Sequence, residues 1–436
     1  MDAENTLPFS DGAPTFRDAS LAQLQTRAMT RYRSAGLPDH KVEAWKYTRL
    51  PSFSDKPYRQ TEETDAVGTA SFSPLISDDG VAGRLVFVNG RLVTELSVTS
   101  GLPEGVRLAP LTEFDADWLA QHLNADVTGT PDGLLSLNLA RCTGGFALVV
   151  ERGVTLTAPI EVINIAASGD GALVWFPRNL IVLEDNTEAT LIVQQTGGDA
   201  GSTFVNAVNE TTLGDNARLH VYTADDSGVG ATIVNRSFAR LGRNAGLSTF
   251  GLYHGGGLAR YEQTVLLEGE GAEARIDGGY LLRGSAHCDN TTRIEHRVPH
   301  TTCNEVFKGV VDDTARAVFQ GKIVVARDAQ HADGQMLNKT LLLSDKAEID
   351  TKPELEIYAD DVKCAHGATS GQIDETALFY LRSRGIPERA ARNLLVRSFL
   401  GDVTERIANA AVRDAMIDRI ERWLPDTIAE TAEQAA

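Results

Sequence analysis

The feature that most constrains the fold is a repeated strand-end motif that begins near residue 180. Each copy has an apolar strand end, a few polar turn residues and an alanine that opens the next strand, as in LEDNTEA, LGDNA, LGRNA, LEGEGA, VDDTA and LSDKA. The alanines are Ala189, Ala217, Ala245, Ala272, Ala315 and Ala347, at spacings of 28, 28, 27, 43 and 32 residues. A nearly fixed period of this size is typical of stacked coils with polar turns in register. We therefore predict a right-handed parallel β-helix, and we interpret the longer intervals as coils with inserted loops.

A β-sandwich with evenly spaced hairpins is the alternative fold. The stretch LVFVNGRLV predicts one hairpin at Asn89-Gly90, because both turn residues tolerate positive φ. After that turn, two-residue hairpin signals are rare. The 39 glycines and the low aromatic content of 6% suit turn-rich β structure better than a helical bundle. The pattern therefore favours the β-helix over the sandwich.

Helical patterns flank the β region. Near the start, DASLAQLQTRAMTRYRSAGLP predicts a helix capped by Asp18. Near the end, Asp374 is positioned to cap ETALFYLRSR, and a second helical run extends from Pro387 to Ile407. A stretch without basic residues between Arg59 and Arg84 resembles a linker. The predicted regions are an N-terminal helical region with a linker over 1–83, a β-helix core over 84–370 and a C-terminal helical region over 371–436.

Charge and cysteine content limit the kinds of partner and the cellular compartment that we expect. Acidic residues outnumber basic residues by 60 to 41, a formal charge of −19 that repels nucleic acid and anionic membrane surfaces. No apolar run has membrane-spanning length, and the acidic start MDAENTLPFSDG lacks the features of a secretory signal. The four cysteines contain no CxxC pair, which argues against a disulfide framework or a zinc finger. We expect a cytoplasmic protein.

Several enzyme classes lack their motifs here. The sequence contains no GxxxxGK[ST], GxSxG or HExxH, so neither P-loop nucleotide hydrolysis nor these serine and zinc hydrolase mechanisms are expected. Two rival functions remain for a β-helix. A polysaccharide-active enzyme would use paired carboxylates and aromatic sugar platforms, although the chain has only 4 tryptophans. A homodimeric structural β-helix without a metal role would bury Cys364.

His296, His300 and Cys303, within RIEHRVPHTTCN, have a spacing compatible with a metal site. Pro299 forces a bend between the two histidines, so the sequence does not show which side chains face the same way. Hydrogen bonding by the imidazoles is the alternative role. The same two interpretations apply to His287-Cys288.

The stretch KCAHGA places Cys364 and His366 two residues apart at the last turn of the β region, where the chain leaves the sheet for the helices. If the segment is extended, both side chains point to one side, and thiolate and imidazole both bind iron. One cysteine and one histidine cannot complete a four-ligand site, so a partner chain would have to supply the remaining ligands. A structural role is the alternative, because cysteine is among the most buried residue types.

Several long segments resemble the SufB/SufD family of iron–sulfur cluster assembly proteins. The hallmark segment is LLLSDKAEIDTKPELEIYADDVKCAHGATSGQIDETALFYLRSRGI over 341–386, and DNTTRIEHRVPHT, ARAVFQGKIVV, VFVNGRLV and KVEAWKYTRL also match. The resemblance spans nearly the whole chain. The short N-terminal helical region, EAWKYT and the CAHGA form of the last motif are closer to the SufD branch than to the SufB branch.

The resemblance implies a parallel β-helix flanked by helical regions and a non-catalytic scaffold role in the SUF complex. It implies pairing with SufB through the β-helix, docking of the ATPase SufC on the C-terminal helical region, and a transient iron–sulfur cluster or iron at the SufB interface, with none permanently bound by the isolated chain. His366 matches a histidine implicated in cluster assembly, and Cys364 is a second candidate ligand or a structural thiol. The candidate SufC contacts are Phe379, Tyr380, Leu395 and Phe399, with packing against the β-helix end as the alternative. Exposed sheet edges also make a homodimer plausible when SufB is missing.

Overall fold

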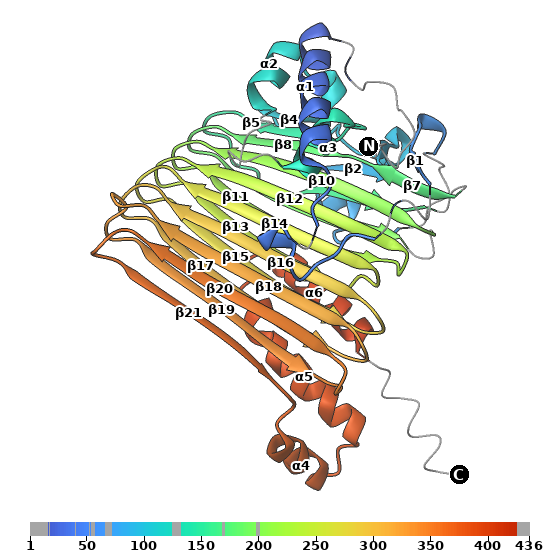
Figure 1. Cartoon of the computed structure of the whole chain (residues 1–436), viewed down its shortest axis with the longest axis vertical. Helices are drawn as coiled ribbons and strands as arrows, with labels where there is room; N and C mark the ends of the chain where they lie inside the picture. The colour runs from blue at the N-terminus through green and yellow to red at the C-terminus, as the bar shows by residue number, and fades with distance from the viewer. Residues whose placement is uncertain are drawn as a thin grey trace.

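The computed structural model describes residues 16, 18–39, 41–51, 53, 57–65, 72–123, 132–167, 171–197 and 201–424. These residues form a stack of strands with helices at the N-terminal end and a second helical group beside the stack (Figure 1). Residues 1–15, residues 66–71 of the predicted linker and residues 425–436 of the predicted C-terminal region lie outside the described residues.

The described strands form two sheets. The first sheet contains, in spatial order, β20 (Glu348–Ile357), β18 (Arg316–Val325), β16 (His287–His296), β14 (Leu258–Leu267), β12 (Ala231–Leu241), β10 (Thr203–Leu213), β8 (Arg178–Leu183), β5 (Phe146–Val150) and β4 (Val106–Pro110), with β7 (Ala172–Trp175) beside β10 and β1 (Tyr58–Gln60) beside β7. The second sheet contains β21 (Lys363–Gly371), β19 (Asp333–Leu342), β17 (Thr302–Val311), β15 (Glu273–Leu282), β13 (Gly246–Tyr253), β11 (Arg218–Ser227), β9 (Glu188–Gly197), β6 (Ile160–Ile165), β2 (Gly83–Val88) and β3 (Arg91–Leu92).

From β8 onward, successive strands alternate between the two sheets, and each strand pairs in parallel with the strand two places along the chain. One coil therefore consists of one strand from each sheet. This arrangement is the predicted parallel β-helix, and it excludes the sandwich, whose sheets are antiparallel. The largest apolar cluster fills the space between the sheets along the length of the stack, from Leu85 in β2 to Ala359 beyond β20.

The even alanine spacing reflects the coil repeat of the second sheet. Ala217, Ala245 and Ala272 directly precede β11, β13 and β15, whose first residues pair with one another. All three side chains are fully buried where the chain turns into the strand. Ala189 is also buried, but it lies two residues further along, because Arg218 pairs with Glu188.

The interval of 43 residues has a different cause from the one predicted. Ala315 and Ala347 precede β18 and β20, which belong to the first sheet, whereas Ala272 precedes a strand of the second sheet. The interval is long because the two alanines belong to different sheets. The interpretation of this interval as a coil with an inserted loop is therefore wrong. The in-register predecessor of Ala315 is Ala286, before β16.

The polar turns before the second-sheet strands are in register, as predicted. Asn186, Asn216 and Asn244 have φ values of 58°, 58° and 54°. Their side chains form a ladder, with Nδ2 of Asn216 donating to Oδ1 of Asn186 at 2.9 Å and Nδ2 of Asn244 donating to Oδ1 of Asn216 at 3.2 Å. Asparagine suits this position because its short side chain tolerates the left-handed region.

The predicted helix and the predicted hairpin both form in the first hundred residues. Helix α1 (Ala19–Ala35) begins after Asp18, whose carboxylate accepts a hydrogen bond from the amide of Ser20 at 2.8 Å. The β2–β3 hairpin turns at Asn89 and Gly90, both with positive φ. Two further helices, α2 (Ala116–His122) and α3 (Gly133–Ala140), lie within the range predicted as β-helix core, where no helix was expected.

The segment KVEAWKYT crosses the outer face of the first sheet. Trp45 packs against the guanidinium of Arg260 at 4.3 Å, and the hydroxyl of Thr48 donates a hydrogen bond to Asp289. Arg260 is fully buried and pairs with Glu262 and Asp289. The segment therefore covers a buried charge network. The described 3-10 helices are Glu43–Trp45, Glu63–Asp65, Asp78–Gly80, Thr94–Leu96 and Leu111–Glu113.

The C-terminal helices are α4 (Glu375–Ser383), α5 (Glu388–Thr404) and α6 (Ala410–Trp423). Asp374 caps α4 as predicted, accepting from the amide of Thr376 at 2.8 Å. The predicted run to Ile407 is wrong at its end: α5 stops at Thr404, and Asn409 caps a separate helix, α6. No described helix is long and apolar enough to cross a membrane.

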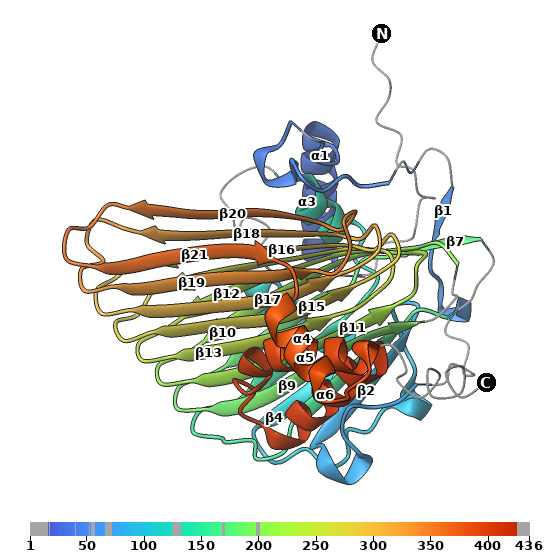
Figure 2. The ribbon, with the colours of Figure 1, turned by 90° about the horizontal axis from the view of Figure 1, so that it is seen from below.

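Helices α4–α6 lie beside the second sheet (Figure 2). The Lys308 ammonium from β17 donates to the carbonyl oxygen of Phe399 at 2.7 Å and to Asp402 at 2.5 Å. Arg406, between α5 and α6, donates to the buried carboxylate of Asp277 at 2.8 Å. These charge-assisted bonds fix the helical region on the β-helix.

Candidate functional site

The last coil of the β-helix ends in two edge strands. In the described part of the chain, β20 pairs only with β18, and β21 pairs only with β19. The KCAHGA stretch begins β21, which confirms that it lies at the end of the β region and meets the condition that the segment is extended. Because side chains two residues apart share one face of a strand, Cys364 and His366 point to the same side.

Cys364 and His366 differ in exposure. Cys364 is half-buried and packs against the main apolar cluster, and burial raises the pKa of its thiol. His366 is exposed, and its imidazole makes no hydrogen bond to any residue that the structure describes. The Cys364 thiol would have to lose its proton before it could bind a metal ion.

Two residue columns extend inward from this pair along the second sheet. Cys364 pairs with Gly334, which pairs with Cys303, and His366 pairs with Met336, which pairs with Glu305. Neighbouring strands are about 4.8 Å apart, so Cys303 and Cys364 are separated by roughly 9.6 Å, too far for a disulfide. All four cysteines are free thiols, and Cys142, Cys288 and Cys303 are buried.

Glu305, in the column of His366, is a buried titratable group that the sequence did not single out. It is fully buried, and neither carboxylate oxygen has a hydrogen bond of normal geometry within the described residues. Burial raises its pKa to about 8, against a smaller opposing effect of the neighbouring Thr292 hydroxyl. The carboxyl is therefore protonated at neutral pH. Its position two residues after Cys303 in one strand was the available signal, because it places both on one face.

The spacing around Pro299 assembles only part of the candidate metal site. His296 and Cys303 do meet, with Nε2 3.2 Å from Sγ, and the other nitrogen of His296 is 2.7 Å from the Thr301 hydroxyl. Burial lowers the pKa of His296 to about 4 and raises that of Cys303 well above its usual range. This contact is therefore a hydrogen bond between two neutral groups.

His300 lies outside this pair. Its φ of 56° places it at the turn position that Asn244 and Gly271 occupy in the preceding coils, and its ring stacks on that of His331 with centroids 4.8 Å apart. Among the described residues, no group of three His, Cys, Asp or Glu side chains is arranged to hold a metal ion. The three residues of the motif are thus divided between the interior and a turn.

His287 and Cys288 point to opposite sides of β16. His287 faces the N-terminal segment, with Nε2 2.9 Å from the Thr48 hydroxyl, whereas Cys288 lies in the main apolar cluster. Burial lowers the pKa of His287 and raises that of Cys288. Adjacent residues of a strand cannot share a face, so this dipeptide does not form a joint site.

The four predicted SufC contacts fall into two groups. Phe379 and Tyr380 on α4 are 72% and 56% exposed, and neither belongs to the apolar cluster of the helices. Leu395 and Phe399 on α5 are partly buried and pack against that cluster. The alternative of packing against the β-helix applies to Phe399, whose ring also faces the Lys308 ammonium at 4.8 Å.

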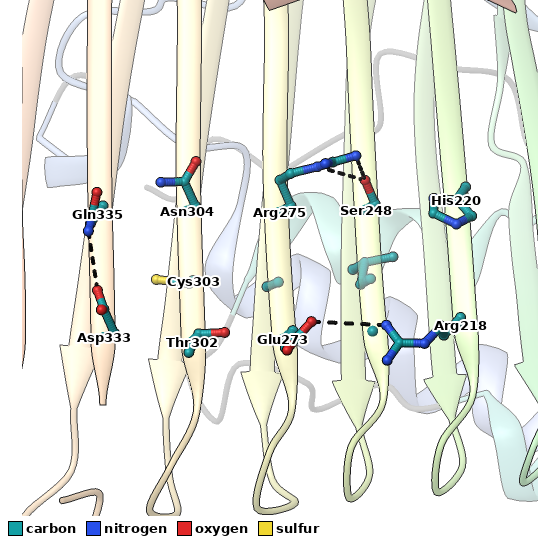
Figure 3. A pocket seen from close by; sticks show the side chains of 13 residues that line it. Arg218, His220, Ser248, Glu273, Arg275, Thr302, Cys303, Asn304, Asp333 and Gln335 are labelled. Atoms are coloured by element: carbon teal, nitrogen blue, oxygen red, sulfur yellow. Dashed lines mark hydrogen bonds and ion pairs between the residues drawn. The ribbon is translucent and has the colours of Figure 1, made fainter. Parts of the chain in front are cut away.

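A polar groove of about 410 Å³ lies over β11 to β19 on the second sheet (Figure 3). Its charged groups are engaged: Arg218 pairs with Glu273 at 4.0 Å, and Arg275 donates to the Ser248 hydroxyl at 2.8 Å. Cys303 contributes to the lining, but its sulfur contacts His296. The groove offers hydrogen-bonding groups without a large excess of charge.

Comparison with known proteins identifies the family of this chain. The family model described as the SUF system FeS cluster assembly, SufBD core domain, matches residues 164–399, and the model of the SufBD protein N-terminal region matches residues 16–162. The iron–sulfur cluster assembly protein SufD of Escherichia coli is 31% identical over 405 residues, which cover 89% of this chain and 90% of the relative. A SufBD family protein of Synechocystis sp. is 30% identical over 408 residues, covering 91% and 89%, and SufD of Bacillus subtilis is 31% identical over 293 residues, covering 66% of each chain. The predicted resemblance is confirmed, and this chain belongs to the SufBD family of iron–sulfur cluster assembly proteins.

Proposed function

We propose that this chain is the SufD-type scaffold subunit of a cytoplasmic SUF complex. It pairs with a SufB subunit through the last coil of the β-helix, docks the ATPase SufC on its C-terminal helices, and contributes to cluster assembly without catalysing a reaction itself. The printed names of the Escherichia coli and Bacillus subtilis relatives support the SufD assignment. The polysaccharide-active alternative has no comparable support.

The end of the β-helix is suited to pairing with another subunit. Strands β20 and β21 leave their outer edges unpaired within the described chain, and such edges readily accept a further strand. Ile357 and Tyr358, at the end of β20, are 40% and 63% exposed. In isolation, the same edge would pair with a second copy of this chain.

The exposed imidazole of His366 at the last coil is the observation that carries the proposal. It lies on the edge strand, has no intramolecular hydrogen bond among the described residues, and shares its face with Cys364. A histidine and a cysteine together leave an iron site open, so a facing SufB chain would supply the other ligands. Iron and sulfide are cargo in this scheme, held transiently at the seam.

The SufC dock is assigned to the exposed face of α4. Phe379 and Tyr380 project there, and Leu394 on α5 is 44% exposed. Aromatic residues are enriched in protein interfaces relative to the rest of the surface, so these exposed side chains suit a partner surface. Leu395 and Phe399, which pack beneath, would hold the helices in place and contact SufC less directly.

Co-expression with SufB and SufC tests the proposal. We expect one complex containing all three proteins by size-exclusion chromatography. The double variant Phe379→Ser/Tyr380→Ser should bind SufC at least about tenfold more weakly and should still bind SufB. The reason is that two anchor side chains are removed from the SufC interface only.

The matched control is Val229→Ser, which removes a 78% exposed side chain in the turn between β11 and β12. This variant should retain both partners. A chain that never associates with SufB would refute the scaffold assignment, and full SufC retention in the double variant would refute the dock.

A further inference from the structure

A basic basin lies at the ends of the second-sheet strands, where α6 meets them. Its cavity volume is about 570 Å³, within the range of small-molecule sites. Phe72, Ser73 and Thr196 form part of its wall, and Trp423 closes it beside α6. The basin contains none of the last-coil residues.

Three arginines and one carboxylate line the basin. Arg283 follows β15, Arg419 and Arg422 come from α6, and Asp226 lies near the end of β11. The lining therefore carries an excess of about two positive charges in a chain whose formal charge is −19. Clustered positive charge in a cavity of a strongly acidic protein favours an anionic ligand.

Within the described residues, the guanidinium groups of the basin have few hydrogen-bond partners. Arg419 is only 7% exposed; it donates to Oε1 of Gln194 at 2.5 Å, but its Nε has no hydrogen-bond partner in the described structure. Arg283 and Arg422 are exposed; within the described residues their guanidinium groups make no hydrogen bond or ion pair, and that of Arg283 stacks against Trp423 at 4.2 Å. The unpartnered Nε of buried Arg419 is costly unless a ligand accepts its hydrogen bond, and the two exposed guanidinium groups remain available to the same ligand.

The arginines converge on one imidazole. His254 also lines the basin. Burial lowers its pKa to about 4, and the positive charges of the three arginines add to this effect against the opposing charge of Asp226. Its Nε2 has no hydrogen-bond partner among the described groups. A neutral imidazole and three guanidinium groups thus surround one space.

We propose that this basin binds a small phosphate-bearing anion. A phosphate group carries a charge of about −1.5 to −2 at neutral pH, which matches the excess charge of the lining. Its oxygens accept the paired N–H groups that arginine presents. Inorganic pyrophosphate and the polyphosphate of a free nucleotide share this chemistry. This site is independent of the proposed cluster site, because it lies over the strand ends near α6 and contains neither Cys364 nor His366.

Calorimetric titration of the purified full-length chain with pyrophosphate tests the site. We expect saturable binding that becomes at least about tenfold weaker in Arg422→Gln and in Arg283→Gln, since each variant removes a charged donor. The control is Arg327→Gln, which removes an exposed arginine in the turn between β18 and β19, at the opposite strand ends. This variant should bind like the unmodified chain.

Two further titrations define the ligand. ATP that binds with the same arginine dependence would support a nucleotide as the source of the phosphate, whereas binding of pyrophosphate alone would support a smaller phosphate ligand. Citrate that binds while pyrophosphate does not would overturn the phosphate assignment. No pyrophosphate binding, or equal binding by the Arg422 variant and the Arg327 control, would overturn the site, provided that thermal melting shows all variants folded.

Discussion

Replacing His366 with alanine is expected to leave the assembled complex intact and to lower its cluster yield at least about tenfold. Loss of an outer hydrogen-bonding partner of a metal ligand already costs roughly 10- to 100-fold in affinity or activity, and loss of a ligand should cost no less. The fold should tolerate the change, because His366 is exposed and has no intramolecular hydrogen bond in the described structure. Anaerobic reconstitution with iron and sulfide, followed by iron counting and absorption spectroscopy, measures the yield.

Two variants separate ligation from a structural effect. His366→Cys should retain part of the yield, because a thiolate also binds iron. His331→Asn removes another exposed imidazole near the end of the stack, at a positive φ that asparagine tolerates, and should keep the full yield. Unchanged cluster formation in His366→Ala would remove this residue from the proposed site.

Replacing Glu305 with glutamine should change how stability depends on pH. The folded chain holds the Glu305 pKa at about 8, whereas the ordinary value is 4.5. Between these values the unfolded chain loses a proton that the folded chain keeps, so the free energy of unfolding falls as pH rises, by about 1.4 kcal/mol per pH unit. Glutamine cannot ionise and removes this loss. Relative to the unmodified chain, the free energy of unfolding of the variant should increase by roughly 3–5 kcal/mol between pH 5 and pH 8.

Urea unfolding at pH 5 and at pH 8 measures this difference. Glu104→Gln, at an exposed position, is the matched control and should follow the unmodified chain at both pH values. Parallel stability curves for Glu305→Gln and the unmodified chain would show that Glu305 is ionised in the folded state. The proton on Glu305 would then be lost at neutral pH.

The β-helix could be predicted because most coils repeat a small buried residue after a polar turn, at a nearly fixed spacing. The same repeat led to the wrong interpretation of the 43-residue interval. Ala272 opens a strand of the second sheet and Ala315 opens a strand of the first, and the sequence pattern does not show to which sheet a strand belongs. The break between α5 and α6 was missed because Ile407 continues the apolar spacing of α5 although it lies beyond the helix.

The candidate site was predictable where it depends on strand alternation and on the end of the repeat. Cys364 and His366 share a face of the last strand, as their spacing predicted. The turn position of His300 depends on its positive φ, which is uncommon for residues other than glycine and was not indicated by the sequence around it. The burial of Glu305 depends on Met336 and the facing sheet, which only the coil register brings together.

The most direct test of His366 as a ligand is pulsed electron paramagnetic resonance of the reduced cluster in the complex, with ¹⁵N-histidine incorporated only into this chain. If His366 binds the cluster, the spectrum shows a ¹⁵N hyperfine coupling that disappears in His366→Ala. A cluster that forms in full and shows no nitrogen coupling from this chain would contradict the placement of His366 at a shared metal site.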